Sequence, residues 1–420
     1  MLSKEYKTKL NILIPYYRDK YLTETKQGKW QKQWFYTDSN LNVQICSSRD
    51  YCAMEKREKL LNDKVYIFAA NKLGKKVIEN SCWDKIIDKY SEQLIEAMNC
   101  KEDDKCAQII DDMLEEMKHI KNILFYEEVI YLFNVLRLFF TKREFCTEKD
   151  FFYLDRIADI FQNNLHDLLL YYLFVYASYH ESEKIDYVLS KYNYNNSRII
   201  SNQRFAMDKL KRESRFVDAQ KGYERILNQI HDSKYDIQKL YIYWDLAIVT
   251  IRFDFYATKE YIKKMQPLLK SLALSNGQYY FFNQALGDIN MDLENYKESI
   301  LFYKNALKYC DTDVVRIFSC LSFCYLMLGE DIPKEYLICD EQNKGDRTDW
   351  LLYDFFKNYD VSTKKQSIDY LTNKVLPVLD KNEVIYLNII EKILLKFSEE
   401  GSSYKPLYLY MKMKKNNNFK

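Results

Sequence analysis

The chain contains little glycine, proline or histidine: 8 Gly, 5 Pro and 4 His among 420 residues. So few helix-breaking residues exclude a loop-rich or collagen-like protein and favour a chain that is mostly helical. None of the four histidines has a Cys, Ser or carboxylate partner at a diagnostic spacing, and no nucleotide-binding glycine motif occurs. We therefore expect a protein that is not an enzyme, with no catalytic residues, no metal and no cofactor.

Long hydrophobic runs are also missing. The most apolar stretches, Leu132–Phe140 and Leu168–Ala177, are much shorter than the ~20 residues that a membrane-spanning helix requires. The chain opens with the polar, basic segment MLSKEYKTKL, which does not look like a secretion signal. Ten cysteines without paired spacing are typical of reduced thiols, and we expect them to be buried. These features predict a cytoplasmic protein with no membrane contact.

Apolar residues make up 47% of the chain, which is enough for a large hydrophobic core. Two segments indicate how the predicted helices pack against each other. Leu286 and Gly287 lie on one predicted helix, and four residues of the next helix share one face because they are three or four apart. Those four are Tyr296, Ser299, Tyr303 and Ala306. Similar places in Phe205–Leu227 are taken by Ala206, Phe216, Ala219, Tyr223 and Ile226.

This arrangement resembles the tetratricopeptide repeat, in which two antiparallel helices cross at small residues. Small residues recur at the corresponding position of successive helix pairs, at Ala206, Ala247, Gly287 and Ser322. The resemblance implies a right-handed α-solenoid over residues 79–420 with a concave wall that suits an extended peptide. The inward-facing positions in this frame are Gln203, Tyr241, Trp244, Phe281, Gln284, Asp288, Arg316 and Ser319. The alternative for each single position is an ordinary packing or surface residue.

Positive charge is concentrated at the amino-terminal end. Residues 1–78 contain 16 Lys+Arg against 8 Asp+Glu, a net charge of +8, whereas the whole chain has a net charge of only +2. A small basic segment joined to a mildly acidic body is typical of a nucleic-acid-binding domain attached to another module.

Short helices are predicted within this basic segment at residues 9–23, Lys29–Phe35, Ile45–Lys56 and Lys64–Leu73. Pro15 is expected to interrupt the first of them. In the third, Ser47 or Ser48 is a natural N-cap, and Tyr51 and Met54 face inward. Gly74 is expected to end the fourth.

The motifs QKQWF, ICSSRDYCAMEK and VYIFAANKLG resemble the helix-turn-helix domain of the Cro/C1 (XRE) type. The resemblance implies that the third helix enters the major groove with Ser47, Ser48 and Arg49. It places Gln31, Lys32, Lys56 and Arg57 against phosphates. Three features depart from the family: the residues YTDSNLNVQ replace a tight turn, Asp50 lies beside Arg49, and the glycine that usually follows the glutamate is missing, with Arg57 nearby instead.

The sequence thus predicts an all-α protein with a helix-turn-helix domain at 1–78 and a tetratricopeptide-like domain at 79–420. This combination resembles the peptide-sensing transcriptional regulators of the PlcR/Rgg/PrgX group. The resemblance implies a cytoplasmic homodimer that binds a double-stranded DNA operator and a short signalling peptide. Two alternatives stay open: a Rap-like protein-interaction adaptor whose head has lost DNA binding, and an enzyme such as a phosphatase housed in the repeats.

Overall fold

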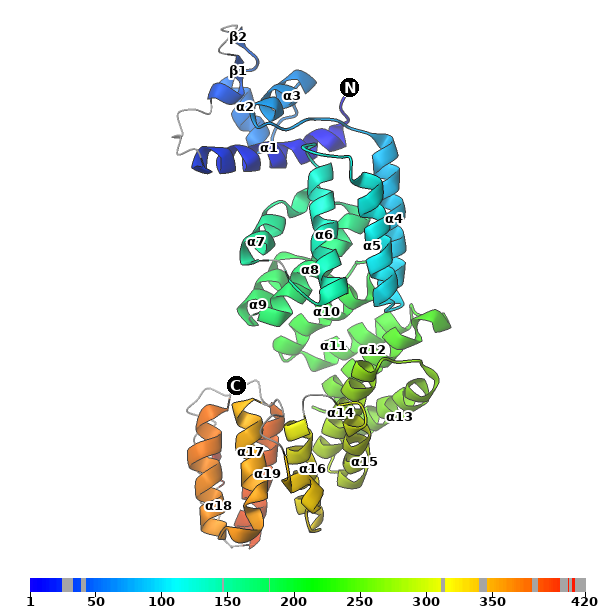
Figure 1. Ribbon diagram of the computed structural model, residues 1–420, viewed down its shortest axis with the longest axis vertical. Coiled ribbons are helices and arrows are strands. Elements are labelled where there is room, and N and C mark those ends of the chain that lie inside the picture. The colour runs from blue at the N-terminus through cyan, green and yellow to red at the C-terminus, as the bar shows by residue number, and fades with distance from the viewer. Residues whose placement is uncertain are drawn as a thin grey trace. The chain divides into compact units, whose positions relative to one another are not determined.

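The computed structural model describes residues 1–24, 33–38, 43–145, 147–180, 182–310, 314–339, 346–379, 384–400, 407, 410 and 411. These residues are almost entirely helical, with helices α1 to α19 and one short hairpin, β1–β2 (Figure 1). The predicted all-α class is confirmed. No helix in the described ranges is long and apolar enough to cross a membrane.

The chain divides into two compact units, Met1–Ile242 and Tyr243–Lys420, each with its own hydrophobic core. The first unit begins with α1 (Lys4–Glu24), β1 (Thr37–Asp38), β2 (Val43–Gln44), α2 (Ser48–Glu55), α3 (Asp63–Lys72), α4 (Ser81–Asn99) and α5 (Asp103–Met117). It continues with α6 (Tyr126–Lys142), α7 (Glu148–Arg156), α8 (Asn163–His180), α9 (Ser182–Lys191), α10 (Ile200–Arg212) and α11 (Phe216–Leu227). The predicted boundary at residues 78/79 is a different division, and it stays a prediction.

Helix α12 (Asp236–Thr250) contains the division between the units. The second unit continues with α13 (Phe255–Ser271), α14 (Asn276–Asp292), α15 (Tyr296–Leu307), α16 (Val314–Leu328), α17 (Arg347–Lys357), α18 (Lys364–Tyr370) and α19 (Val384–Glu400). A π turn at Leu371–Val375 and a 3₁₀ turn at Leu376–Val378 follow α18. Pro377, which has no backbone N–H, lies in that 3₁₀ turn, where the regular helix has ended.

The amino-terminal helices differ in part from the prediction. Helix α1 begins earlier than expected and runs through Pro15 without a break. Of the predicted helix at 29–35, residues 29–32 lie outside the described part of the chain, and 33–35 form a single 3₁₀ turn. The residues that replace the tight turn include the antiparallel strands β1 and β2, paired Thr37 with Gln44 and Asp38 with Val43.

Capping residues explain the bounds of α2 and α3. The Ser47 hydroxyl accepts the Asp50 backbone N–H at 3.0 Å and so caps α2, as predicted. Gly74 follows α3 with a φ of 67°, a conformation that favours glycine and ends the helix.

The helical hairpins predicted from small residues are present. The Ser299 hydroxyl of α15 donates to the Gly287 carbonyl of α14 at 2.8 Å, so the two helices touch at the glycine. The predicted contact face of α15 is buried at Tyr296, Ser299, Tyr303 and Ala306. In α11 the corresponding residues Ala219, Tyr223 and Ile226 are buried as well. The continuous solenoid inferred from these hairpins stays a prediction.

The cysteines correct one expectation. The nine described cysteines are free thiols, but Cys52 and Cys82 are exposed rather than buried. Cys320 and Cys324 are buried on α16, and the Cys324 thiol lies 3.5 Å from the Ser299 hydroxyl.

Candidate functional site

The amino-terminal tip of α2, residues 47–49, is an exposed part of the predicted DNA-binding surface. Ser47, Ser48 and Arg49 are all exposed, whereas Tyr51 and Met54, one turn further along, are fully buried. The helix therefore presents its first turn outward and buries the side that faces α1. This division matches the orientation that the sequence predicted for these five residues.

A buried ion pair attaches α2 to α1. The Arg18 guanidinium of α1 pairs with the Glu55 carboxylate of α2, and their side chains are only 4% and 12% exposed. Removing Arg18 would leave the Glu55 charge without this partner in the core, which is strongly unfavourable, whereas Arg18 also pairs with Asp19 at 2.5 Å. The pair was not singled out from the sequence, although both residues continue stripes of apolar residues: Arg18 follows Ile14 by four positions, and Glu55 follows Tyr51 by four.

The charges around this tip are partly neutralised. Asp50 pairs with Lys59 at 2.6 Å, and the hydrogen bonds from Lys59 and Ser47 hold the pKa of the Asp50 carboxyl below its ordinary value. The negative charge that would repel phosphate beside Arg49 therefore has its own counterion. Lys56 is exposed.

Arg57 has a protein partner of its own. Its guanidinium lies 2.5 Å from the carboxylate of Asp159, on the short turn that follows α7. Both side chains are exposed, at 48% and 66%, so the ion pair is weak and can exchange for a phosphate. The predicted phosphate contacts Gln31 and Lys32 lie outside the described residues.

The opposite side of the amino-terminal segment is fixed to α6 and the loop before it. The Tyr6 hydroxyl lies 2.7 Å from the Leu124 carbonyl oxygen, and Lys76 exchanges backbone hydrogen bonds with Asn122 and Leu124 at 2.7 and 3.0 Å. Lys75 pairs with Glu127 at 2.6 Å. The amino-terminal segment is therefore attached to α6 and the loop before it, while the tip of α2 stays exposed.

The predicted peptide contacts of the first unit lie beside two cations that the sequence did not single out. The Gln203 amide donates to the Ser197 carbonyl at 2.8 Å. The Tyr241 ring has the ammonium of Lys101 at 5.5 Å and the guanidinium of Arg204 at 4.9 Å from its centre. Burial and the neighbouring Arg204 lower the pKa of Lys101 to about 8. Two cations at one aromatic ring would favour an anionic group nearby.

In the second unit, three predicted contacts bind each other. Arg316 of α16 pairs with Asp288 of α14 at 3.1 Å, and the Gln284 oxygen accepts from the same guanidinium at 3.0 Å. The Tyr303 hydroxyl donates to Asp288 at 2.6 Å. Burial raises the pKa of Asp288 to about 6, in spite of Arg316. The cluster links α14, α15 and α16, so its first role is to hold the hairpins together.

The remaining predicted contacts divide into two kinds. Trp244 and Phe281 are partly exposed and their rings meet edge to face, with centres 4.9 Å apart. The indole N–H of Trp244 is buried and has no acceptor among the described residues. Ser319 is a correction: it is fully buried and its hydroxyl donates to the Val315 carbonyl of its own helix, so it offers no group to a peptide.

The comparisons add no relative: no family model, no curated protein and no solved structure matches this chain. Within the part of the chain that the structure describes, no group of three or more His, Cys, Asp or Glu side chains is placed to hold a metal ion.

Proposed function

We propose that this chain is a DNA-binding transcriptional regulator of the helix-turn-helix type, resembling the peptide-sensing PlcR/Rgg/PrgX group. In this proposal the tip of α2 enters the major groove, and the helical body binds a short peptide and holds two copies together. The observation that carries the proposal is that Ser47, Ser48 and Arg49 at the start of α2 are exposed, whereas Tyr51 and Met54 of the same helix are fully buried.

The size and chemistry of the tip suit duplex DNA. The major groove admits one α-helix, and in helix-turn-helix proteins the first residues of that helix contact the base edges. Helix α2 has 8 residues and presents two hydroxyls and one guanidinium at this end. Arginine donates two parallel hydrogen bonds to guanine, and serine donates to or accepts from several bases.

Electrostatics supports the same role. The net charge of +8 over residues 1–78 attracts the phosphate backbone, and the Asp50–Lys59 pair removes a local repulsion. The Arg18–Glu55 pair fixes the orientation of α2 against α1. A helix that contacts base edges needs such a fixed orientation to distinguish DNA sequences. Two copies of the chain would place two tips on one face of the duplex, about 34 Å apart.

Peptide binding is supported by one buried donor and by two cations beside an aromatic ring. The buried Trp244 indole N–H has no acceptor among the described residues, an arrangement that costs about 1–3 kcal/mol unless an acceptor is supplied. A peptide carbonyl is such an acceptor. Lys101 and Arg204 beside Tyr241 suit a peptide carboxylate, which binds arginine through paired hydrogen bonds.

The DNA part of the proposal is tested by selecting random duplexes with the full-length protein. We expect enrichment of a motif with two related half-sites about 10 base pairs apart. Arg49→Ala should weaken binding to the selected duplex about 10- to 100-fold, the usual worth of one guanine contact. The matched control is Arg137→Ala on α6, because Arg137 is also exposed, at 50%, and lies outside the amino-terminal segment. Equal losses in both variants, or no enriched motif, contradict DNA reading by α2.

The peptide part is tested by selecting a library of random heptapeptides on the same protein. Selected peptides should lose affinity for Trp244→Phe, which keeps an aromatic ring at this position but removes the N–H donor. Lys89→Met, a change on α4 outside the predicted contacts, should leave their affinity unchanged. Peptides that bind Trp244→Phe as well as they bind the unmodified protein would contradict a role for this donor.

A second candidate is an adaptor that holds a partner protein and does not bind DNA. Two observations favour it: Arg57 forms an ion pair with Asp159, and the first unit has an open cleft of 750 Å³ whose lining contains none of the predicted peptide contacts. The cleft is lined by residues that include Glu92, Glu96 and Arg198. An affinity for duplex DNA that changes neither with ionic strength nor in the Arg49→Ala variant would favour the adaptor over the regulator.

A further inference from the structure

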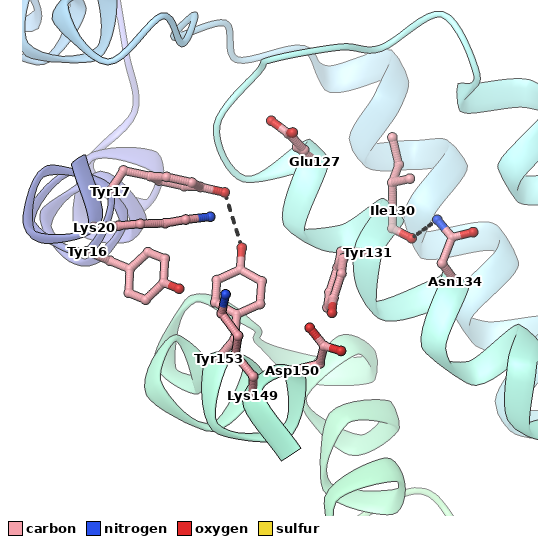
Figure 2. Close-up of a pocket in the computed structure, with 10 residues that line it drawn as sticks. All are labelled: Tyr16, Tyr17, Lys20, Glu127, Ile130, Tyr131, Asn134, Lys149, Asp150 and Tyr153. Carbon is pink, nitrogen blue, oxygen red and sulfur yellow. Dashed lines mark hydrogen bonds between the residues drawn. The ribbon is translucent and has the colours of Figure 1, made fainter. Parts of the chain in front are cut away.

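A cavity of 380 Å³ lies between α1, α6 and α7 within the first unit. Its volume is in the range of small-molecule sites, which begin at about 300 Å³. Figure 2 shows side chains from all three helices directed toward this space. The lining residues are Tyr16, Tyr17, Lys20, Glu127, Ile130, Tyr131, Asn134, Lys149, Asp150 and Tyr153.

Aromatic rings form much of the wall. The rings of Tyr16 and Tyr153 are 5.0 Å apart at their centres, and Tyr131 meets Tyr153 edge to face at 5.3 Å. The Tyr17 hydroxyl donates to the buried Glu128 carboxylate at 2.5 Å and lies 3.2 Å from the Tyr153 hydroxyl. These contacts fix the rings before any ligand arrives, so a planar molecule could bind them with little loss of side-chain entropy.

The acidic residues of the lining already have partners. Glu127 is paired with Lys75 at 2.6 Å. Asp150 accepts the backbone N–H and the hydroxyl of Thr147 at 3.1 and 2.7 Å, as the cap of α7. Although burial opposes ionisation of Asp150, hydrogen bonds from Tyr131 and Thr147 and the positive charge of Lys149 hold the pKa of its carboxyl below the ordinary value.

The two lysines of the lining are different. Neither Lys20 nor Lys149 forms an ion pair with any residue in the described ranges. In Figure 2 the Lys20 side chain extends from α1 toward Tyr153, and the Lys149 side chain comes from α7. The lining thus combines fixed aromatic rings with two exposed lysines that form no ion pair among the described residues, although the charge of Lys149 also acts on the Asp150 carboxylate.

We propose that this cavity binds a small anionic aromatic molecule, a planar ring that carries a carboxylate or phosphate. The ring lies against Tyr16 and Tyr153, and the anionic group pairs with Lys20 and Lys149. The cavity is separate from the tip of α2 and from the predicted peptide contacts, so this inference does not depend on the proposed function.

Calorimetric titration of the full-length protein tests the proposal with five probes. The aromatic anions are 4-hydroxybenzoate and phenyl phosphate, and comparing them distinguishes a carboxylate from a phosphate ligand. The neutral ring is 4-hydroxybenzamide, and the anions without an aromatic ring are cyclohexanecarboxylate and inorganic phosphate. We expect at least one aromatic anion to bind at least tenfold more tightly than the neutral ring and than the matching non-aromatic anion.

Variants identify the site. Lys20→Met combined with Lys149→Met should weaken binding of that probe at least tenfold, whereas Lys4→Met, the same change near the other end of α1, should not. Tyr16→Leu removes a partly exposed ring and should also weaken binding, and Tyr16→Phe should restore it. Unfolding curves check that each variant is folded.

Three results would overturn the proposal. They are the absence of binding by both aromatic anions at 5 mM (about the weak limit of a useful site), equal binding of the neutral ring, and unchanged binding by the double lysine variant. Equal binding of inorganic phosphate and phenyl phosphate would likewise reject a role for the aromatic wall.

Discussion

Substituting Gly287 by alanine tests the helical hairpin that organises the second unit. A Cβ at Gly287 would lie 2.6 Å from Cε1 and 2.7 Å from Cδ1 of Tyr303. Carbon atoms in contact prefer about 3.5–4.0 Å, so the tyrosine ring would have to retreat by about 1 Å. The ring has little room to do so, because it is fully buried and its hydroxyl donates to Asp288 at 2.6 Å.

Two effects of the substitution oppose each other. Alanine in a helix interior is favoured over glycine by about 1 kcal/mol. Overpacking a buried contact costs about 1–3 kcal/mol, and disturbing a hydrogen bond to a carboxylate adds about 1.5–3 kcal/mol. We therefore expect Gly287→Ala to destabilise the α14–α15 hairpin by about 2 kcal/mol.

Hydrogen exchange measured by mass spectrometry on peptides from α14 and α15 reports this change locally. A loss of about 2 kcal/mol corresponds to roughly 30-fold faster exchange of the protected amides. Gly277→Ala is the matched control, since Gly277 lies in the first turn of the same helix and a Cβ there meets nothing within 4 Å. The control should exchange at the same rate or more slowly. Slower exchange in both variants would refute the close crossing at Gly287.

Three further changes have defined outcomes. Glu128 is fully buried, and burial raises its pKa from 4.5 to about 7, so its stabilising contribution is complete below about pH 4.5 and is lost as the pH rises through 7. Glu128→Gln should therefore reduce the pH dependence of the unfolding free energy by about 3 kcal/mol between pH 4.5 and 8, as measured by urea unfolding; an unchanged dependence would contradict the burial. Arg18→Met should cost about 3–5 kcal/mol by leaving Glu55 buried without its partner, and adding Glu55→Leu should recover most of the loss in the same assay. Asp159→Asn should release Arg57 for a phosphate contact, so that the slope of log affinity against log salt becomes steeper by about 0.9. An unchanged slope would contradict a phosphate contact by Arg57.

Helical periodicity was enough to predict the elements that bury a regular face. The α14–α15 hairpin could be predicted because Gly287, Ser299 and Tyr303 occupy the crossing in a spacing that only a helix pair satisfies. The cap at Ser47 and the buried side of α2 followed from side-chain chemistry within one turn. Such features depend on residues close together in the chain.

Features that depend on distant residues could not be predicted. The partner of Arg57 is Asp159, more than one hundred positions away, and the cavity joins α1 to α6 and α7.

Two single residues differ from the prediction. The sequence placed Ser319 on a concave wall because of its position along the helix, but in the structure Ser319 of α16 is fully buried. Pro15 was expected to interrupt α1, yet the helix continues on both sides because its apolar stripe of Leu10, Leu13 and Ile14 is fully buried.

The most direct test of the central claim, that α2 and the residues that flank it contact duplex DNA, is the salt dependence of binding. The affinity of the full-length protein for a mixed-sequence 30-base-pair duplex is measured across a series of salt concentrations for the unmodified chain and for Lys56→Ala, with Lys121→Ala in the loop before α6 as control. If Lys56 neutralises one phosphate, the slope of log affinity against log salt becomes shallower by about 0.9 in Lys56→Ala alone. Binding that does not change with salt, or slopes that are equal in all three proteins, would contradict the claim.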